Sequence, residues 1–145
     1  MTSLVIGNDH RGVALKEKLA SWILPPDNSR FDVSIINDVG AHNSHSVDYP
    51  DIVKKFAPKI DVNNNGILIC GTGFGVCIAA NRYKNIRAVV ARSVKEVQLA
   101  RQHNNVNVLC LGADFTSFWQ AKRLIRAFYL TQFEAGRHQK RIKKL

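Results

Sequence analysis

Residues 66–75 read Gly66-Ile67-Leu68-Ile69-Cys70-Gly71-Thr72-Gly73-Phe74-Gly75. An apolar run ends at a cysteine, and three alternating glycines follow before a segment with helical character. A buried strand that turns through glycines into a helix presents unpaired backbone N–H groups, which bind anions. A thiol close to such donors can act as a thiolate. The stretch therefore predicts an anion-binding site and an acid–base group within one turn of an α/β fold.

The spacing of the glycines narrows the choice of ligand. A dinucleotide-binding G-x-G-x-x-G loop would need glycine at position 76, where the chain has Val76, and no Gly-Lys-Ser/Thr motif is present. We interpret the loop as a nest of backbone donors around a small, oxygen-rich ligand. The alternative is a tight strand-to-helix turn in which Cys70 is an ordinary buried thiol.

The composition bounds the class of protein. The chain has 145 residues, 46% of them hydrophobic, which predicts a single domain over residues 1–145. No apolar run approaches the roughly 20 residues of a membrane span, and the segment 1–4 does not resemble a signal peptide. Three cysteines without a C-x-x-C pair favour a reducing cytoplasm and argue against a zinc site. The net charge of +10 gathers partly near the C-terminus, but no nucleic-acid motif accompanies it, so we expect neither a nucleic-acid nor a membrane partner.

Apolar periodicity predicts alternating strands and helices. The expected strands are Leu4–Gly7, Phe31–Ile36, Ile67–Cys70, Arg87–Ala91 and Asn107–Leu111. The expected helices are Gly12–Trp22 (stopped by residues 25–28), Asp48–Lys59 (with Pro58 ending it early), one starting near Gly75, Ser93–His103, Thr116–Leu130 and one from Phe133 that is interrupted at Gly136. Ser93 and Glu96 have the spacing of a capping box, and residues 63–66 are expected to form a turn. The pattern predicts a Rossmann-like three-layer α/β sandwich with a five-stranded parallel sheet.

In such a sheet the functional residues gather beyond the carboxyl ends of the strands. Asp9 and His10 follow the first strand, and residues 70–75 follow the third. His103 instead precedes the fifth strand, which places it at the opposite edge of the sheet. We interpret this mismatch as a hint that the site is shared between two copies of the chain.

Several blocks, in order along nearly the whole chain, resemble one family. These blocks are residues 7–10 with Gly12, 48–50, 66–75, 78–81, 86–88, 101–109 and 136–141. Together they resemble the type B ribose-5-phosphate isomerases and the related galactose-6-phosphate isomerase subunits. The resemblance implies an aldose–ketose isomerase that interconverts D-ribose 5-phosphate and D-ribulose 5-phosphate through a cis-enediolate, without metal or coenzyme, in the non-oxidative pentose phosphate pathway.

The resemblance also implies roles for individual residues. Cys70 is similar to the cysteine that serves as base in one branch of the family and moves the proton between neighbouring carbons. His103 is similar to the histidine that opens the sugar ring, supplied in the family by the other subunit of a dimer. We therefore expect a cytoplasmic homodimer, with pairing of two dimers as an open alternative. The expected enediolate donors are the Thr72 hydroxyl and the amides of Gly71, Thr72, Gly73, Phe74 and Gly75.

Further residues are expected to bind the substrate. Asn104 would hold a sugar hydroxyl, and Asp9 would accept a hydroxyl or ring-oxygen proton. Arg137 and Arg141, spaced i,i+4, would share the phosphate with His10 as a third contact. The other histidines, His42, His45 and His138, are expected to be loop or surface residues.

Three positions depart from the family pattern. Asp114 stands where many relatives have a basic residue, so a phosphate contact is expected to be missing there. Phe74 occupies a position that is smaller in some relatives or Glu in the branch with a carboxylate base, and Arg82 stands where Lys is common. Three alternatives stay open: an allose- or galactose-6-phosphate isomerase, a catalytically silent sugar-phosphate binder, and a basic nucleic-acid-binding protein.

Overall fold

A single parallel sheet organises the chain. The structure is a computed structural model that describes residues 2–23 and 33–145. Its strands pair in the order β2-β1-β3-β5-β4, and every neighbouring pair is parallel. The strands are β1 (Thr2–Asn8), β2 (Val33–Asp38), β3 (Asn64–Cys70), β4 (Ala88–Val90) and β5 (Val108–Gly112). The predicted five-stranded parallel sheet is confirmed.

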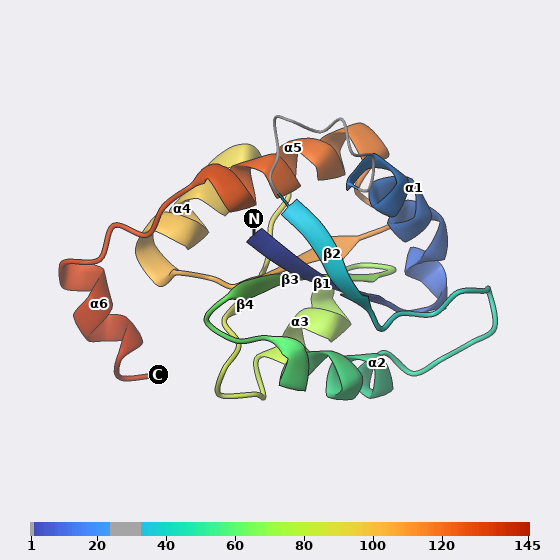
Figure 1. The fold of residues 1–145 in the computed structure, drawn as a ribbon, viewed down its shortest axis with the longest axis horizontal. Helices are drawn as coiled ribbons and strands as arrows, with labels where there is room; N and C mark the ends of the chain where they lie inside the picture. The colour runs from blue at the N-terminus through green and yellow to red at the C-terminus, as the bar shows by residue number, and fades with distance from the viewer. Residues whose placement is uncertain (1, 24–32) are drawn as a thin grey trace.

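Helices cover both faces of this sheet, as Figure 1 shows. The α1/α4/α5 face carries α1 (Val13–Ile23), α4 (Val94–Asn104) and α5 (Phe118–Leu130), which pack into one apolar cluster. The α2/α3 face carries α2 (Tyr49–Phe56) and α3 (Phe74–Ala80), which pack into a second cluster. The short helix α6 (Arg137–Ile142) lies beyond the end of α4. The three-layer α/β sandwich is confirmed.

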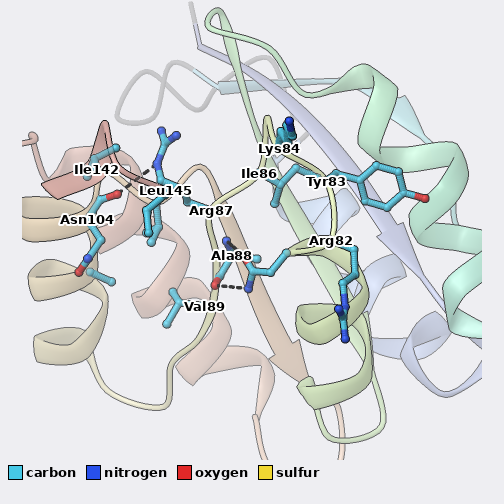
Figure 2. A pocket seen from close by; sticks show the side chains of 13 residues that line it. Arg82, Tyr83, Lys84, Ile86, Arg87, Ala88, Val89, Asn104, Ile142 and Leu145 are labelled. Carbon is cyan, nitrogen blue, oxygen red and sulfur yellow. Dashed lines mark hydrogen bonds between the residues drawn. The ribbon is translucent and has the colours of Figure 1, made fainter. Parts of the chain in front are cut away.

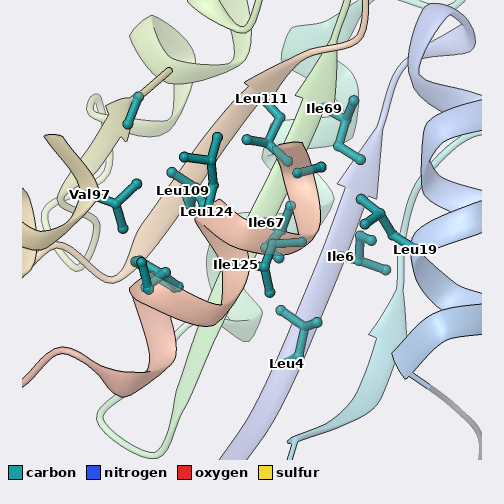
Figure 3. Packing of buried hydrophobic residues seen from close by; sticks show 14 of the residues in the cluster. Leu4, Ile6, Leu19, Ile67, Ile69, Val97, Leu109, Leu111, Leu124 and Ile125 are labelled. Atoms are coloured by element: carbon teal, nitrogen blue, oxygen red, sulfur yellow. The ribbon is translucent and has the colours of Figure 1, made fainter. Parts of the chain in front are cut away.

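Successive side chains along each strand point to opposite faces of the sheet and join two separate apolar clusters. In β3, Ile67 and Ile69 pack against the α1/α4/α5 face, whereas Leu68 and Cys70 pack against the α2/α3 face. Figure 3 shows Leu124 and Ile125 of α5 packed over the first of these layers. Because successive strand side chains point to opposite faces, the position of Cys70 in β3 fixes the side of the sheet on which its thiol lies.

The order of the strands creates one crevice. From β1 the chain runs through α1 to β2 on one side, and from β3 it runs through α3 to β4 beyond β5 on the other side. In open α/β sheets, ligands bind outside the carboxyl ends of two neighbouring strands whose following connections run to opposite sides of the sheet. Here that point lies between the end of β1 at Asn8 and the end of β3 at Cys70.

Most of the helix ends predicted from local sequence patterns are confirmed by the structure. Asp48 is the N-cap of α2, and the capping box of Ser93 and Glu96 starts α4. The helix α2 ends at Phe56, and Pro58 lies in the 3₁₀ turn Ala57–Lys59 that follows, in keeping with the early end expected at this proline. The predicted stop at residues 25–28 and the predicted start of the second strand at residue 31 lie outside the described residues.

Two boundary predictions are wrong. The expected turn over residues 63–66 is mostly strand, because residues 64–66 pair with residues 3–5 of β1 and the sheet overrides the turn preference of asparagine. The last helix begins at Arg137 and not at residue 133. Ala135 and Gly136 have φ of +55° and +53°, which the right-handed helix does not allow.

None of the helices in the described ranges is long and apolar enough to cross a membrane.

Candidate active site

Cys70 lies at the end of β3 with its sulfur facing a backbone donor. The side chain is buried, with 4% of its surface exposed, and the Gly73 amide donates a hydrogen bond to Sγ at 3.1 Å. Gly73 has φ of +83°, a left-handed conformation that glycine adopts readily, and this turn points its amide back at the sulfur. The predicted thiol and one of its predicted backbone donors, the Gly73 amide, therefore do come together.

Some backbone amides of the loop donate to protein acceptors and others do not. The Phe74 amide donates to Thr72 Oγ1 at 3.2 Å, so it is engaged within the protein, as is the Gly73 amide. Among the described residues, the amides of Gly71, Thr72 and Gly75 have no protein acceptor. Of the five donors predicted from the sequence, these three are free to donate to an oxygen of a ligand. The hydroxyl of Thr72, which already accepts from Phe74, keeps its own proton for donation.

Asp9 and His10 stand across the crevice from this loop. The Asp9 amide donates to the Ile69 carbonyl at 3.1 Å, which ties the end of β1 to β3. Asp9 is buried, and its Oδ1 accepts from the Arg11 amide at 2.9 Å. His10 Nδ1 accepts from the Val47 amide at 3.2 Å, which leaves the ring proton on Nε2 to be donated to a ligand. The predicted gathering of Asp9, His10 and Cys70 is thus present in one chain.

Two further thiols lie near Cys70. A hydrogen bond with the side chain of Cys110 lowers the pKa of Cys77, whereas burial raises the pKa of Cys110. All three cysteines are free. Cys77, half-buried on α3, is therefore the thiol that a test of the Cys70 assignment has to control for.

His103 belongs to a second cluster. Its ring, near the end of α4, stacks on that of His138 with centroids 4.4 Å apart and planes 10° apart. His138 lies on α6 between Arg137 and Arg141, and its Nε2 is 3.9 Å from Glu134 Oε2. Burial, with the positive charges of His103 and the two arginines, lowers the pKa of His138. The expectation that His138 is a surface residue is wrong, because it is 8% exposed.

The two clusters lie at opposite edges of the sheet. Cys70 pairs with Gly112 at the carboxyl end of β5, whereas His103 and Asn104 come just before its amino end at Val108. Five residues of strand span about 13 Å, so His103 cannot reach the thiol of its own chain. Figure 1 shows α6 beyond α4 at one end of the molecule and α1 at the other. A single chain therefore does not bring the predicted site together.

The second cluster resembles a metal site in composition. The ligand atoms of His103, Glu134 and His138 all lie within 4.8 Å of one another. A metal bound by imidazole lies near the plane of the ring, and two nearly parallel rings 4.4 Å apart share no such plane. The stacked arrangement fits a pair of imidazoles packed face to face better than a pair of ligands.

A cleft of about 550 Å³ opens beside the second cluster, away from Cys70. Figure 2 shows Arg82 and Lys84 on one side of it and Arg87, Asn104 and Ile142 on the other. Arg87 Nε donates to the Asn104 carbonyl at 3.2 Å, and burial lowers the pKa of Arg87. Neither Cys70 nor His103 lines this cleft, so we do not assign the reaction to it despite its volume.

Two side chains at the crevice were not found by sequence reasoning. The guanidinium of Arg11 forms an ion pair with Asp114, which follows β5. The guanidinium of Arg92 lies 5.5 Å from the Phe74 ring and 4.8 Å from the Phe115 ring. Phe74 and Asp114, two of the departures from the family pattern, thus each interact with an arginine. No local pattern in the sequence indicated either interaction.

Comparisons with known proteins show the family to which the chain belongs. The sequence model of the Ribose/Galactose Isomerase family matches residues 4–145. Ribose-5-phosphate isomerase B of Escherichia coli is 37% identical over 147 residues, covering 100% of this chain and 95% of the relative.

Solved structures show the same fold. Ribose 5-phosphate isomerase B from Anaplasma phagocytophilum has a TM-score of 0.90 at 37% identity, over 99% of this chain and 96% of that one. The enzyme from Mycoplasma genitalium, solved with bound ribulose-5-phosphate, has a TM-score of 0.87 at 38% identity, over 99% and 93% of the two chains. With a family match over almost its whole length and relatives at this identity, the chain belongs to the ribose/galactose isomerase family.

Proposed function

We propose that this protein interconverts D-ribose 5-phosphate and D-ribulose 5-phosphate through a cis-enediolate. The observation that carries the proposal is the buried Cys70 thiol, whose sulfur faces the Gly73 amide at the crevice between β1 and β3. The names of the full-length relatives, one of them solved with ribulose-5-phosphate, support the pentose as substrate.

Cys70 acts as the base in this scheme. Its thiolate takes the proton from C2 of the open-chain aldose, and the resulting thiol returns a proton to C1 of the enediolate. The developing oxygen charge is met by the free amides of Gly71, Thr72 and Gly75 and by the Thr72 hydroxyl. These donors are held by the loop before the reaction starts, so they need no reorganisation.

Asp9 and His10 hold the substrate on the β1 side. The Asp9 carboxylate accepts a hydrogen bond from a sugar hydroxyl, while the Asp9 amide ties the residue to β3. His10 donates from Nε2, because Nδ1 is occupied by the Val47 amide. No step in this scheme calls for a metal or a coenzyme.

The remaining groups come from a second copy of the chain, so we infer a homodimer. His103 opens the ring and Asn104 holds a hydroxyl, while Arg137 and Arg141, one turn apart on α6, bind the phosphate. Support for this arrangement is the length of β5, which keeps these groups away from Cys70 of their own chain. Because Cys70 has to stay reduced to act, we place the enzyme in the cytoplasm.

Turnover of the purified protein tests the proposal. We expect ribulose 5-phosphate to form from ribose 5-phosphate in the presence of a chelator, and faster than allose 6-phosphate is converted. Faster conversion of the hexose would make the protein a hexose-phosphate isomerase. No turnover on either sugar would leave only a sugar-phosphate binder.

Variants of two cysteines test the base. We expect Cys70→Ala to abolish turnover and keep sugar-phosphate binding measurable by calorimetry, because the base does not hold the phosphate. Cys77→Ala is the matched control, since Cys77 is the neighbouring thiol with a lowered pKa, and it should stay active. The reverse pattern would move the base to Cys77.

A further inference from the structure

Arg11 stands over the glycine loop without a part in the scheme above. It lies in the 3₁₀ turn His10–Gly12, and its amide donates to Asp9 Oδ1 at 2.9 Å, so the turn fixes where the side chain begins. Its guanidinium occupies the space into which a side chain at position 71 would project, since a Cβ built on Gly71 would collide with Cζ and Nη1 of Arg11. Gly71 therefore leaves room for a cation at the crevice.

Asp114 holds this guanidinium in place. Its carboxylate pairs with Nη2 of Arg11, and its amide donates to the Gly71 carbonyl at 2.9 Å. The Arg11 side chain is 52% exposed and that of Asp114 is 40% exposed, and an ion pair this open adds little to stability. The ion pair instead fixes the position of the Arg11 guanidinium. The carboxylate engages one nitrogen of the five-donor guanidinium, and the other donors remain for a ligand.

The cation lies on the other side of the sheet from the thiol. Cys70 projects toward the α2/α3 face, and position 71 projects toward the opposite face, so Arg11 and the thiol flank the crevice from two sides. In ribose 5-phosphate the reacting carbons C1 and C2 lie at one end and the phosphate on C5 at the other. A substrate whose C1 and C2 meet Cys70 can therefore direct its phosphate toward Arg11, whose planar fork suits phosphate oxygens.

We propose that Arg11 binds the phosphate of the sugar phosphate and that Asp114 positions its guanidinium for this contact. The inference rests on the proposed function, and it reverses the expectation that Asp114 leaves the site without a cation near the end of β5. The carboxylate at position 114 is neutralised by Arg11 and serves as the anchor for the positive charge.

Steady-state kinetics with ribose 5-phosphate tests the contact. We expect Arg11→Ala to raise KM about 10- to 100-fold, the range for one charge-assisted hydrogen bond, with kcat nearly unchanged. Inorganic phosphate, used as a competitive inhibitor, should lose affinity in parallel. Arg126→Ala is the matched control, because it removes the same charge from an exposed position on α5. A KM equal in the two variants, or a phosphate inhibition constant that stays at the parent value, would overturn the proposal.

A double-mutant cycle tests the positioning role of Asp114. Asp114→Asn alone should raise KM several-fold, because the guanidinium loses its anchor. In the Arg11→Ala background the same change should lower KM, because it removes an unpaired carboxylate near the phosphate. A lower KM in both backgrounds would mean that Asp114 only repels the substrate, and the positioning role would be refuted.

The test separates failure of this inference from failure of the proposed function. Turnover of the parent protein on ribose 5-phosphate is measured first and decides the function by itself. If the parent does not turn over, calorimetric binding of inorganic phosphate to the parent, Arg11→Ala and Arg126→Ala proteins replaces KM. Weaker phosphate binding confined to Arg11→Ala then supports the contact, and equal binding in all three proteins overturns it.

Discussion

Replacing Gly73 by alanine probes the turn that joins the thiol to its donor. Gly73 has φ of +83°, and an added Cβ would stand 3.0 Å from both the Gly112 nitrogen and the Leu111 carbonyl carbon. These neighbours are backbone atoms of a central strand and cannot move aside. We expect Gly73→Ala to weaken the fold and to remove the amide from Cys70 at the same time.

The size of the effect follows from three contributions. An L-residue in the left-handed region costs about 1–2 kcal/mol, and forced contacts in a packed region cost about 1–3 kcal/mol. Reduced freedom of the unfolded chain returns about 0.4–1 kcal/mol. We therefore expect the free energy of unfolding to fall by about 2–3 kcal/mol, which lowers Tm by about 5–10 °C in a chain of this length.

Gly71→Ala is the matched control, because a Cβ there meets the exposed guanidinium end of the Arg11 side chain, which can be displaced, and not backbone. Its free energy of unfolding should change by less than about 0.5 kcal/mol, while KM rises through displacement of Arg11. Urea unfolding followed by circular dichroism, together with turnover assays, measures both quantities. A Gly73→Ala protein that unfolds at the parent's urea concentration and keeps its turnover would refute this account of the turn.

Three more perturbations test other parts of the structure. Lys16→Met should cost about 1–3 kcal/mol, because it removes the ion pair of the buried Lys16 with Asp38, 3.0 Å away, and the hydrogen bond from Nζ to the Ala41 carbonyl; urea unfolding measures the cost. The lowered pKa of His138 means that the unfolded chain binds this proton first, so stability falls as the pH drops below about 6.5; His138→Asn should lose less stability between pH 7 and 5.5 than the parent, with His45→Asn as control. Ser93→Ala removes the cap of α4 and should cost about 1 kcal/mol, readable as a fall in Tm.

The fold was largely predictable because its signals are local. The β-branched run Ile67–Cys70, the capping box of Ser93 and Glu96, and the alternation of strands with helices each carry their information within a few residues. One error lies where distant pairing decides, since strand β3 is extended by its pairing with β1. The other is the start of α6, which the positive φ of Ala135 and Gly136 delays to Arg137.

The candidate site could be predicted only in its strand-end residues. Asp9, His10 and Cys70 follow strands directly, so the topology places them at one crevice. The pairing of Arg11 with Asp114 joins positions 103 residues apart, and no periodicity or spacing marks it. The stacking of His138 on His103 likewise depends on how α6 returns to α4.

The distance between His103 and Cys70 has a genetic consequence. When each active site draws on two copies, an allele that lacks the thiol and an allele that lacks the imidazole damage different halves of the site. A mixed pair then contains one site with both defects and one with neither. Two inactive alleles expressed together would restore function in about a quarter of the sites. Either allele expressed beside the normal gene would leave half of the sites complete, because a mixed pair keeps one site with both groups, so neither allele would be dominant.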